Sequence, residues 1–98
     1  MKTITTTEVQ QAIESGAALK LIDVREVEEV EAGHIPGITN IPLSELELRM
    51  PELDKNEKYI VVCRSGNRSG MATQLLESQG FDATNMVGGM LEWQGEVE

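Results

Sequence analysis

The sequence predicts an α/β domain in which helices cover both faces of a mainly parallel β-sheet. Two segments, Leu19–Val24 and Tyr59–Cys63, are short, rich in β-branched residues and almost continuously apolar, as strands buried on both faces are. Segments with helical spacing separate them, and the predicted element order is β-α-β-α-α-β-α-β. Ligands in such folds bind beyond the carboxyl ends of the strands, so Cys63 is expected to stand at a ligand-binding edge.

Helices in the first half of the chain are predicted from caps and from helix-breaking residues. One of the threonines at positions 5–7 caps a first helix that runs to about Ser15, and Gly16 ends it. Glu26–Gly33 has the composition of a short helix. Leu43–Met50 is predicted to be a further short helix, which Pro51 is expected to stop.

The second half is predicted to contain one longer helix and a final strand. Ser69–Gln79 has helical spacing, and Gly80 suits the end of that helix. Thr84–Val87 is a weaker candidate for the last strand. The expected apolar stripe of the helix consists of Met71, Ala72, Leu75 and Leu76.

Length and composition predict one domain that spans residues 1–98 without a metal, cofactor or disulfide. The 98 residues are 40% hydrophobic, which is enough for one modest core. Cys63 is the only cysteine and His34 the only histidine, so a metal-ligand set and an internal disulfide are both excluded. No apolar segment has the length of the hydrophobic region of a signal peptide or of a membrane-spanning helix. We therefore expect a cytoplasmic protein that does not bind membranes.

The charge distribution excludes one class of ligand and suggests another. Seventeen acidic residues against eight basic ones give a net charge of −9, and an acidic surface repels nucleic acid. Two of the bases, Arg64 and Arg68, flank the cysteine. A cationic spot on an acidic protein predicts a small anionic ligand; the alternative role for these arginines is salt bridging with nearby acids.

The segment "VVCRSGNRSGM" places Cys63 between a buried strand and a helix. Gly66 and Asn67 tolerate the backbone angles of a tight turn, and the N–H groups of such a turn can converge on the sulfur or on an anion bound to it. Together with the two arginines, they favour thiolate over thiol. Ser65 and Ser69 are turn and cap residues, and Ser69 is expected to cap the helix while donating to the loop. The alternative is that Cys63 is a small core residue at a strand end. That role does not explain why two arginines and two serines surround it.

Four motifs resemble those of the rhodanese family. "LIDVRE", "GHIPG" followed by "NIP", "VVCRSGNRS" and "GGMLEW" occur in the family's order and approximate spacing over nearly the whole chain. The resemblance implies a three-layer fold with a central five-stranded, mostly parallel sheet and helices on both faces. It also implies a persulfide on Cys63 and an active-site loop from Cys63 to Arg68 whose amides face the sulfur. Val27, Val30 and Ile38 depart from the residues usual near these motifs.

The resemblance also suggests residues that support the site. Asp23 and Arg25 match a pair that braces the architecture near the active site. The "GGMLEW" motif is expected to pack beside the catalytic loop, with Trp93 in the core. His34 is expected to be a turn histidine with local hydrogen bonds, in preference to a general base.

Three functions fit a thiolate held in such a loop. The favoured one is a sulfurtransferase in which Cys63 takes sulfur from a small anionic donor such as thiosulfate and passes it to cyanide, a thiol or a small redox protein. A carrier or docking module that holds the persulfide without turnover is a second. The third is a cysteine phosphatase or arsenate reductase; related phosphatases place the arginine one residue later than the six-residue segment Cys63–Arg68 does, which adds roughly 3.5 Å to the loop. A monomer is favoured over an oligomer.

Overall fold

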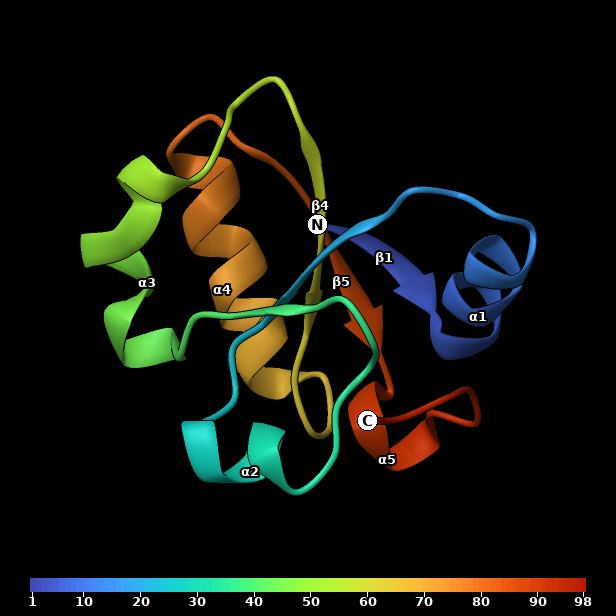
Figure 1. Ribbon diagram of the computed structural model, residues 1–98. Helices are drawn as coiled ribbons and strands as arrows, with labels where there is room; N and C mark the ends of the chain where they lie inside the picture. The colour runs from blue at the N-terminus through green and yellow to red at the C-terminus, as the bar shows by residue number, and fades with distance from the viewer.

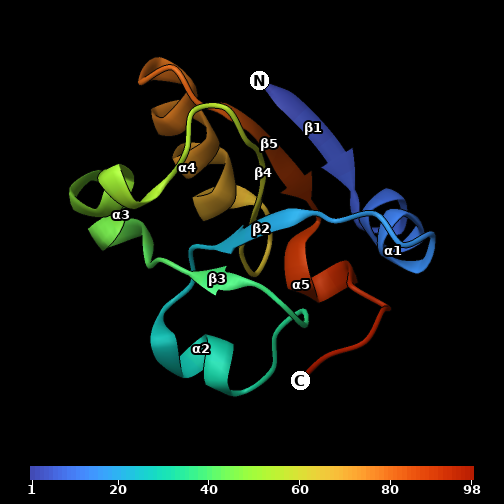
Figure 2. The same cartoon turned by 45° about the horizontal axis from the view of Figure 1, so that its top comes forward.

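The computed structural model describes residues 1–98 and is built around a five-stranded sheet whose neighbouring strands are all parallel (Figure 2). The strand order is β1-β5-β4-β2-β3, so β4 is central. The strands are β1 (Lys2–Thr5), β2 (Lys20–Asp23), β3 (Thr39–Asn40), β4 (Lys58–Val62) and β5 (Asp82–Val87). The helices are α1 (Thr6–Glu14), α2 (Val27–Glu31), α3 (Leu43–Arg49), the 3₁₀ turn η1 (Met50–Glu52), α4 (Asn67–Ser78) and α5 (Gly89–Glu92).

Helices cover both faces of the sheet, which confirms the predicted three-layer α/β fold. In Figure 1, α3 and α4 lie on one side of the sheet, and α1 and α5 on the other. Two apolar clusters fill the space between the layers. The larger one joins β2 and β4 to α3 and α4 and includes Cys63, whereas the smaller one is centred on Val9, Leu21, Ile35, Val62 and Met86. None of the helices reaches the length and apolar character that crossing a bilayer requires.

The predicted start of the first helix is confirmed by its cap. The Thr5 hydroxyl accepts a hydrogen bond from the Glu8 amide at 3.1 Å, and the Glu8 carboxylate accepts one from the Thr5 amide at 2.9 Å. This reciprocal pair satisfies donors that the first turn of a helix otherwise leaves free. The helix ends before Gly16, whose φ of +86° supports the expected stop.

The longest helix, α4, begins two residues earlier than predicted, because Gly66 supplies the turn alone. Gly66 has a φ of +104° and precedes the first helical residue, Asn67, so Asn67 is not the second unusual residue of the turn. Ser69 consequently lies inside the helix, and its expected role as the cap is wrong. Of the predicted apolar stripe, Ala72 and Leu76 are buried and Leu75 packs against the core, whereas Met71 points to solvent with 61% of its surface exposed. Ser69, Gly70 and Thr73 complete the buried face.

Two short elements were not visible in the periodicity of the sequence. β3 has only two residues, and its pairing with the end of β2 (Ile22 with Thr39, Asp23 with Asn40) is what places it in the sheet. Pro51 does not simply stop the preceding helix; it lies at the start of the 3₁₀ turn η1, where a residue without an N–H costs no hydrogen bond.

Candidate active site

The central strand carries Cys63 to the carboxyl edge of the sheet, where the chain turns back over its sulfur. The Gly66 amide donates a hydrogen bond to Sγ at 3.0 Å. Sγ also lies 3.2 Å from the Ser69 hydroxyl oxygen. The left-handed conformation of Gly66 makes this return possible, because it points the amide inward while the chain enters α4. The loop thus aims donors at one sulfur atom.

These hydrogen bonds outweigh the effect of burial on the thiol. Burial raises the pKa of Cys63, but the hydrogen bond with the Ser69 side chain and those from the backbone amides of Ser69, Gly66 and Ser65 stabilise the thiolate and leave the pKa below its ordinary value. Cys63 has no exposed surface and belongs to the larger apolar cluster. Its side chain therefore packs as a core residue, while its sulfur faces a polar ring.

The final helix, α5, contacts the start of the cysteine loop through its backbone. The amides of Met90 and Leu91 donate to the carbonyl groups of Cys63 and Arg64, both at 2.9 Å. Gly89 has a φ of +57° and lies so close that an added Cβ would stand 2.5 Å from the Arg64 carbonyl oxygen. The segment "GGMLEW" therefore lies beside the loop. Trp93 packs against the smaller apolar cluster, and its Nε1 donates to the Glu96 carbonyl at 3.0 Å.

The two arginines of the loop differ in their surroundings. The Arg68 guanidinium forms a bidentate ion pair with the Glu29 carboxylate of α2, with N–O distances of 2.6 and 2.9 Å. Arg64 is exposed and forms no ion pair. Glu29 offsets charge on Arg68, although the charge of Cys63 also raises the pKa of Arg68. The lowered pKa of Cys63 itself has hydrogen bonds as its causes, so a role for the two guanidinium groups at the sulfur stays a prediction.

The pairing with Arg68 predicts an acid-sensitive contribution of Glu29 to stability. The hydrogen bond from Arg68 lowers the pKa of Glu29 from 4.5 to about 2. The carboxylate therefore stabilises the folded state at a pH above 4.5, and this contribution is lost as the pH falls toward 2. We expect Glu29→Gln to lower the free energy of unfolding by about 1 kcal/mol at neutral pH, since the pair is partly exposed, with the difference from wild type vanishing near the lower pH.

Urea unfolding of both proteins across this pH range measures the difference. Glu28→Gln removes the same charge from the same helix without touching an ion pair and is the matched control. A difference that stays constant between neutral and acidic pH, or an equal loss in the control, would contradict the role of the pair.

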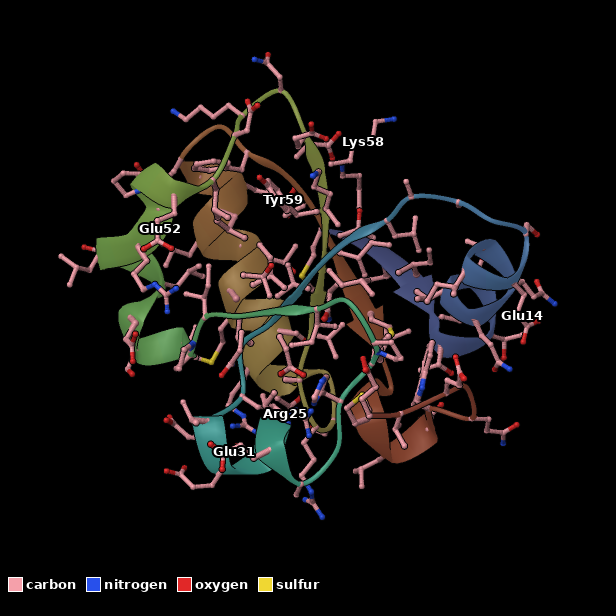
Figure 3. All side chains as sticks on the ribbon, in the orientation of Figure 1. Glu14, Arg25, Glu31, Glu52, Lys58 and Tyr59 are labelled. Carbon is pink, nitrogen blue, oxygen red and sulfur yellow. The ribbon has the colours of Figure 1, made fainter.

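A buried ion pair lies next to the loop, at the end of β2. Arg25 Nε and Nη2 donate to the Asp23 carboxylate at 2.9 to 3.1 Å, and Nη2 also donates to the Gly33 carbonyl at 2.8 Å. Figure 3 shows Arg25 beside α2. Asn40 of β3, which the sequence did not single out, donates from its side chain to the carbonyl groups of both paired residues at 2.9 and 3.0 Å. The pair joins β2, α2 and β3, so it is placed to brace this edge of the sheet.

His34 lies in a turn with its polar atoms satisfied locally. Its Nδ1 is 2.8 Å from the Val30 carbonyl oxygen, which can only accept, so Nδ1 carries the proton. Its backbone exchanges two hydrogen bonds with Glu98. No hydrogen bond joins His34 to Cys63. This arrangement matches the expected turn histidine.

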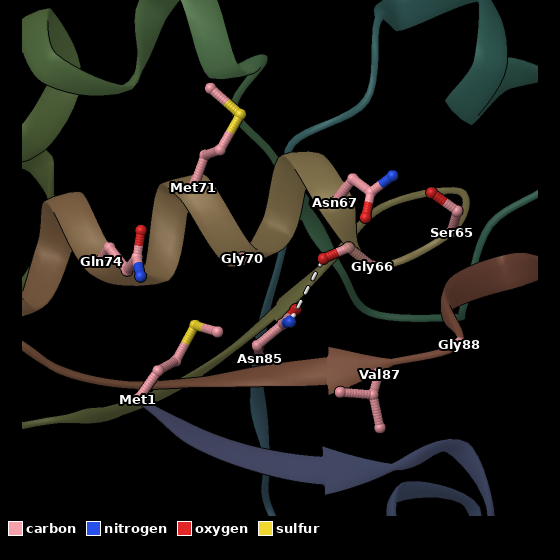
Figure 4. Close-up of a pocket in the computed structure, with 10 residues that line it drawn as sticks. All are labelled: Met1, Ser65, Gly66, Asn67, Gly70, Met71, Gln74, Asn85, Val87 and Gly88. Atoms are coloured by element: carbon pink, nitrogen blue, oxygen red, sulfur yellow. Dashed lines mark hydrogen bonds between the residues drawn. The ribbon is translucent and has the colours of Figure 1, made fainter.

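One polar residue near the cysteine was missed by the sequence interpretation. Asn85 of β5 is buried, accepts a hydrogen bond from the Ser69 hydroxyl at 2.5 Å and donates one to the Gly66 carbonyl at 3.2 Å. Its only signal in the sequence is a polar amide within the predicted strand Thr84–Val87. A pocket of about 440 Å³ opens beside it and reaches the loop at Ser65, Gly66 and Asn67, whereas Cys63 does not line it (Figure 4).

Comparison with known proteins gives consistent matches. The rhodanese-like domain family matches residues 5–96. Human thiosulfate:glutathione sulfurtransferase is 39% identical over 107 residues, which cover 93% of this chain and 91% of the human protein. YrkF of Bacillus subtilis, provisionally named a sulfur carrier protein, is 44% identical over 90 residues, or 91% of this chain; the chain spans about half of its length (49%). The crystal structure of a rhodanese-like domain protein from Staphylococcus aureus superimposes with a TM-score of 0.94 at 37% identity, covering 100% of this chain and 97% of that one.

Proposed function

Because the chain belongs to the rhodanese-like domain family, we propose that it is a sulfurtransferase that carries sulfur as a persulfide on Cys63. The observation that carries this proposal is the ring of donors around the sulfur, with the Gly66 amide at 3.0 Å and the amides of Ser65 and Ser69 lowering the pKa of the thiol. Such a ring stabilises one negative charge on the attacking sulfur before the reaction and on the transferred sulfur after it. The nucleophile needs no histidine base.

Loading is a displacement at sulfur. The Cys63 thiolate attacks the outer, sulfane sulfur of an anionic donor such as thiosulfate, and a new S–S bond forms. The S–S bond of the donor breaks, and sulfite leaves with the electron pair. The product is Cys63–S–S⁻, whose terminal charge faces the loop amides. No net oxidation is required, since the donor supplies sulfur at the sulfane level.

Unloading repeats the displacement in the opposite sense. A thiolate acceptor attacks the terminal sulfur, leaves as a new persulfide and returns Cys63 to its thiolate form; cyanide would leave as thiocyanate. The human relative is named for thiosulfate and glutathione, which supports this pair of substrate classes for the present chain. The name of YrkF supports the second candidate, a persulfide carrier from which a partner protein removes the sulfur.

Access to the sulfur requires movement of the loop. Cys63 has no exposed surface, so the donor reaches Sγ only when residues over it move aside. Ser65 and Asn67 are exposed and Gly66 is half-buried, so the segment between Cys63 and α4 is the part with the fewest contacts to lose. The carbonyl groups of Cys63 and Arg64 stay bonded to α5, which leaves the strand end as a fixed point.

The exposed, unpaired Arg64 is the residue we expect to attract the donor anion. Arg64→Ala should raise KM for thiosulfate about three- to tenfold with a smaller change in kcat, since a solvent-exposed charge contributes about 1 kcal/mol. Arg49→Ala is the matched control, because it removes the same charge from α3, where Arg49 is paired with Glu45 and Glu52. Steady-state kinetics at two salt concentrations measure both variants. An equal rise in KM for the control would assign the effect to the net charge of the protein.

Mass spectrometry of the intact protein tests the proposal. Incubation with thiosulfate should add one sulfur atom to the chain, and a thiol or cyanide should remove it. Catalytic release of thiocyanate favours the enzyme, whereas a loaded protein that releases sulfur at most once per chain favours the carrier. A chain that gains no sulfur from thiosulfate or from a low-molecular-weight persulfide would refute both.

A further inference from the structure

Asn85 closes a ring of hydrogen bonds that begins and ends at the Cys63 sulfur. Its Nδ2 donates to the Gly66 carbonyl at 3.2 Å, which Figure 4 shows as a dashed line, and the Gly66 amide donates to Sγ at 3.0 Å. On the other side, Oδ1 accepts from the Ser69 hydroxyl, whose oxygen lies 3.2 Å from Sγ. Ser69 has no exposed surface and Asn85 only 4%. Solvent water therefore does not reach Ser69, the group that Cys63 and Asn85 share.

The orientation of the Asn85 amide follows from its partners. The Gly66 carbonyl can only accept a hydrogen bond, so Nδ2 must face it and Oδ1 must face Ser69. The opposite orientation would place two acceptor oxygens against each other. The Ser69 hydroxyl is consequently the donor to Oδ1, and toward Cys63 it offers only a lone pair.

This arrangement gives every group a partner when Cys63 is a thiol, whereas a thiolate keeps the support of the backbone amides but must compete for the hydroxyl proton of Ser69. A thiol donates its own proton to the Ser69 oxygen, so each group in the ring has a partner. A thiolate can only accept, and the single hydroxyl proton of Ser69 then has two acceptors, Sγ and Asn85 Oδ1. Turning the proton to the sulfur leaves a buried amide oxygen without a donor, and a buried acceptor without a partner is destabilised.

We propose that Asn85 is a positioning residue that competes with Cys63 for the hydroxyl proton of Ser69 and thereby limits ionisation of the unloaded cysteine. The inference rests on the proposed function, because it concerns the sulfur that would accept the transferred atom. Once the persulfide forms, its negative charge resides on the outer sulfur and Sγ is no longer anionic. The competition therefore acts on the free thiol and is relieved in the loaded state.

Charged groups also approach the cysteine, from several elements. Most are paired with each other, and none is altered by a change at position 85. They are Arg68 of α4 with Glu29 of α2, the Asp23–Arg25 pair after β2, the exposed Arg64, and Glu92 of α5, whose carboxylate lies against Gly88. A difference in thiol ionisation between wild type and an Asn85 variant thus reports on the hydrogen-bond ring.

The test is the pH dependence of alkylation of Cys63 by iodoacetamide, which reports thiolate formation without requiring sulfur transfer. Asn85→Leu removes the competing acceptor, and the Gly66 carbonyl keeps its bond from the Gly70 amide at 3.0 Å. We expect the apparent pKa of the thiol to fall by about one pH unit, which raises the alkylation rate about tenfold below that pKa. Thermal unfolding verifies that the variant is folded. Asn85→Val is a second variant that removes the same acceptor, with a residue that favours strands.

A double-mutant cycle with Ser69→Ala separates the proposal from a merely structural effect. Without the hydroxyl there is no proton to compete for, so Asn85→Leu should leave the pKa of the Ser69→Ala protein unchanged. An unchanged or raised pKa in the single Asn85 variants, or the same fall in the Ser69→Ala background, would overturn the proposal. Failure of the proposed function would look different: sulfur loading would be absent in wild type while the pKa differences persisted.

Discussion

Replacing Cys63 with serine is expected to abolish sulfur loading and to reduce sulfur transfer by about three orders of magnitude or more. A persulfide needs an S–S bond, and Cys63 is the only cysteine of the chain. A serine hydroxyl in the same cradle ionises far less readily than a thiol, so the hydrogen bonds of the loop cannot produce a comparable nucleophile. Intact-mass measurement after thiosulfate and a thiocyanate assay give the two readouts.

The variant is a fair test because the fold should tolerate it. Sγ already has a donor in the Gly66 amide and a polar neighbour in the Ser69 hydroxyl, so a hydroxyl at this position has partners. Urea unfolding should therefore show a loss of no more than about 1 to 2 kcal/mol, the usual range for a single substitution. One sulfur added to the folded serine variant would place the acceptor atom elsewhere and refute the assignment of Cys63.

Gly89→Ala is expected to have the largest effect on stability, a loss of about 3 kcal/mol in the free energy of unfolding from strain and overpacking together. The new Cβ would stand 2.5 Å from the Arg64 carbonyl oxygen and 2.6 Å from the Cys63 carbonyl oxygen, and the φ of +57° disfavours any side chain. Backbone atoms cannot rotate away as a flexible side chain can. Relief requires α5 and the cysteine loop to separate, which would break the bonds from Met90 and Leu91.

A second glycine isolates the steric part of this effect. Gly16 has a φ of +86° but no atom within 4 Å of its added Cβ, so Gly16→Ala should cost only about 1 kcal/mol of backbone strain. Sulfur loading should be impaired in the folded fraction of the Gly89 variant and normal in the Gly16 variant. Equal destabilisation of the two proteins, with normal loading in both, would show that α5 does not hold the loop in its active form.

Much of the fold follows from local patterns. The apolar runs that begin at Leu19 and Tyr59 predicted two strands of the sheet, and the threonines at positions 5–7 predicted the start of α1, because strand burial and helix capping depend on residues close in sequence. Elements without such a signal were missed or displaced. β3 is a strand only because β2 pairs with it, and α4 begins at Asn67 because Gly66 alone makes the turn.

By itself, the sequence determined the α/β class, the family motifs and the place of Cys63 at the end of a central strand. Each of these features depends on short segments of neighbouring residues. Only the tertiary structure decided which partners meet there. Arg68 pairs with Glu29, which lies 39 positions away in the sequence, and Ser69 donates a hydrogen bond to Asn85, which lies 16 positions away. A charge or an amide carries no local mark of its partner, because hydrogen bonds and ion pairs depend on distances in space that the whole fold sets. The two arginines that flank Cys63 in the sequence therefore differ in their surroundings, since Arg68 is paired with Glu29 and Arg64 is exposed without an ion pair.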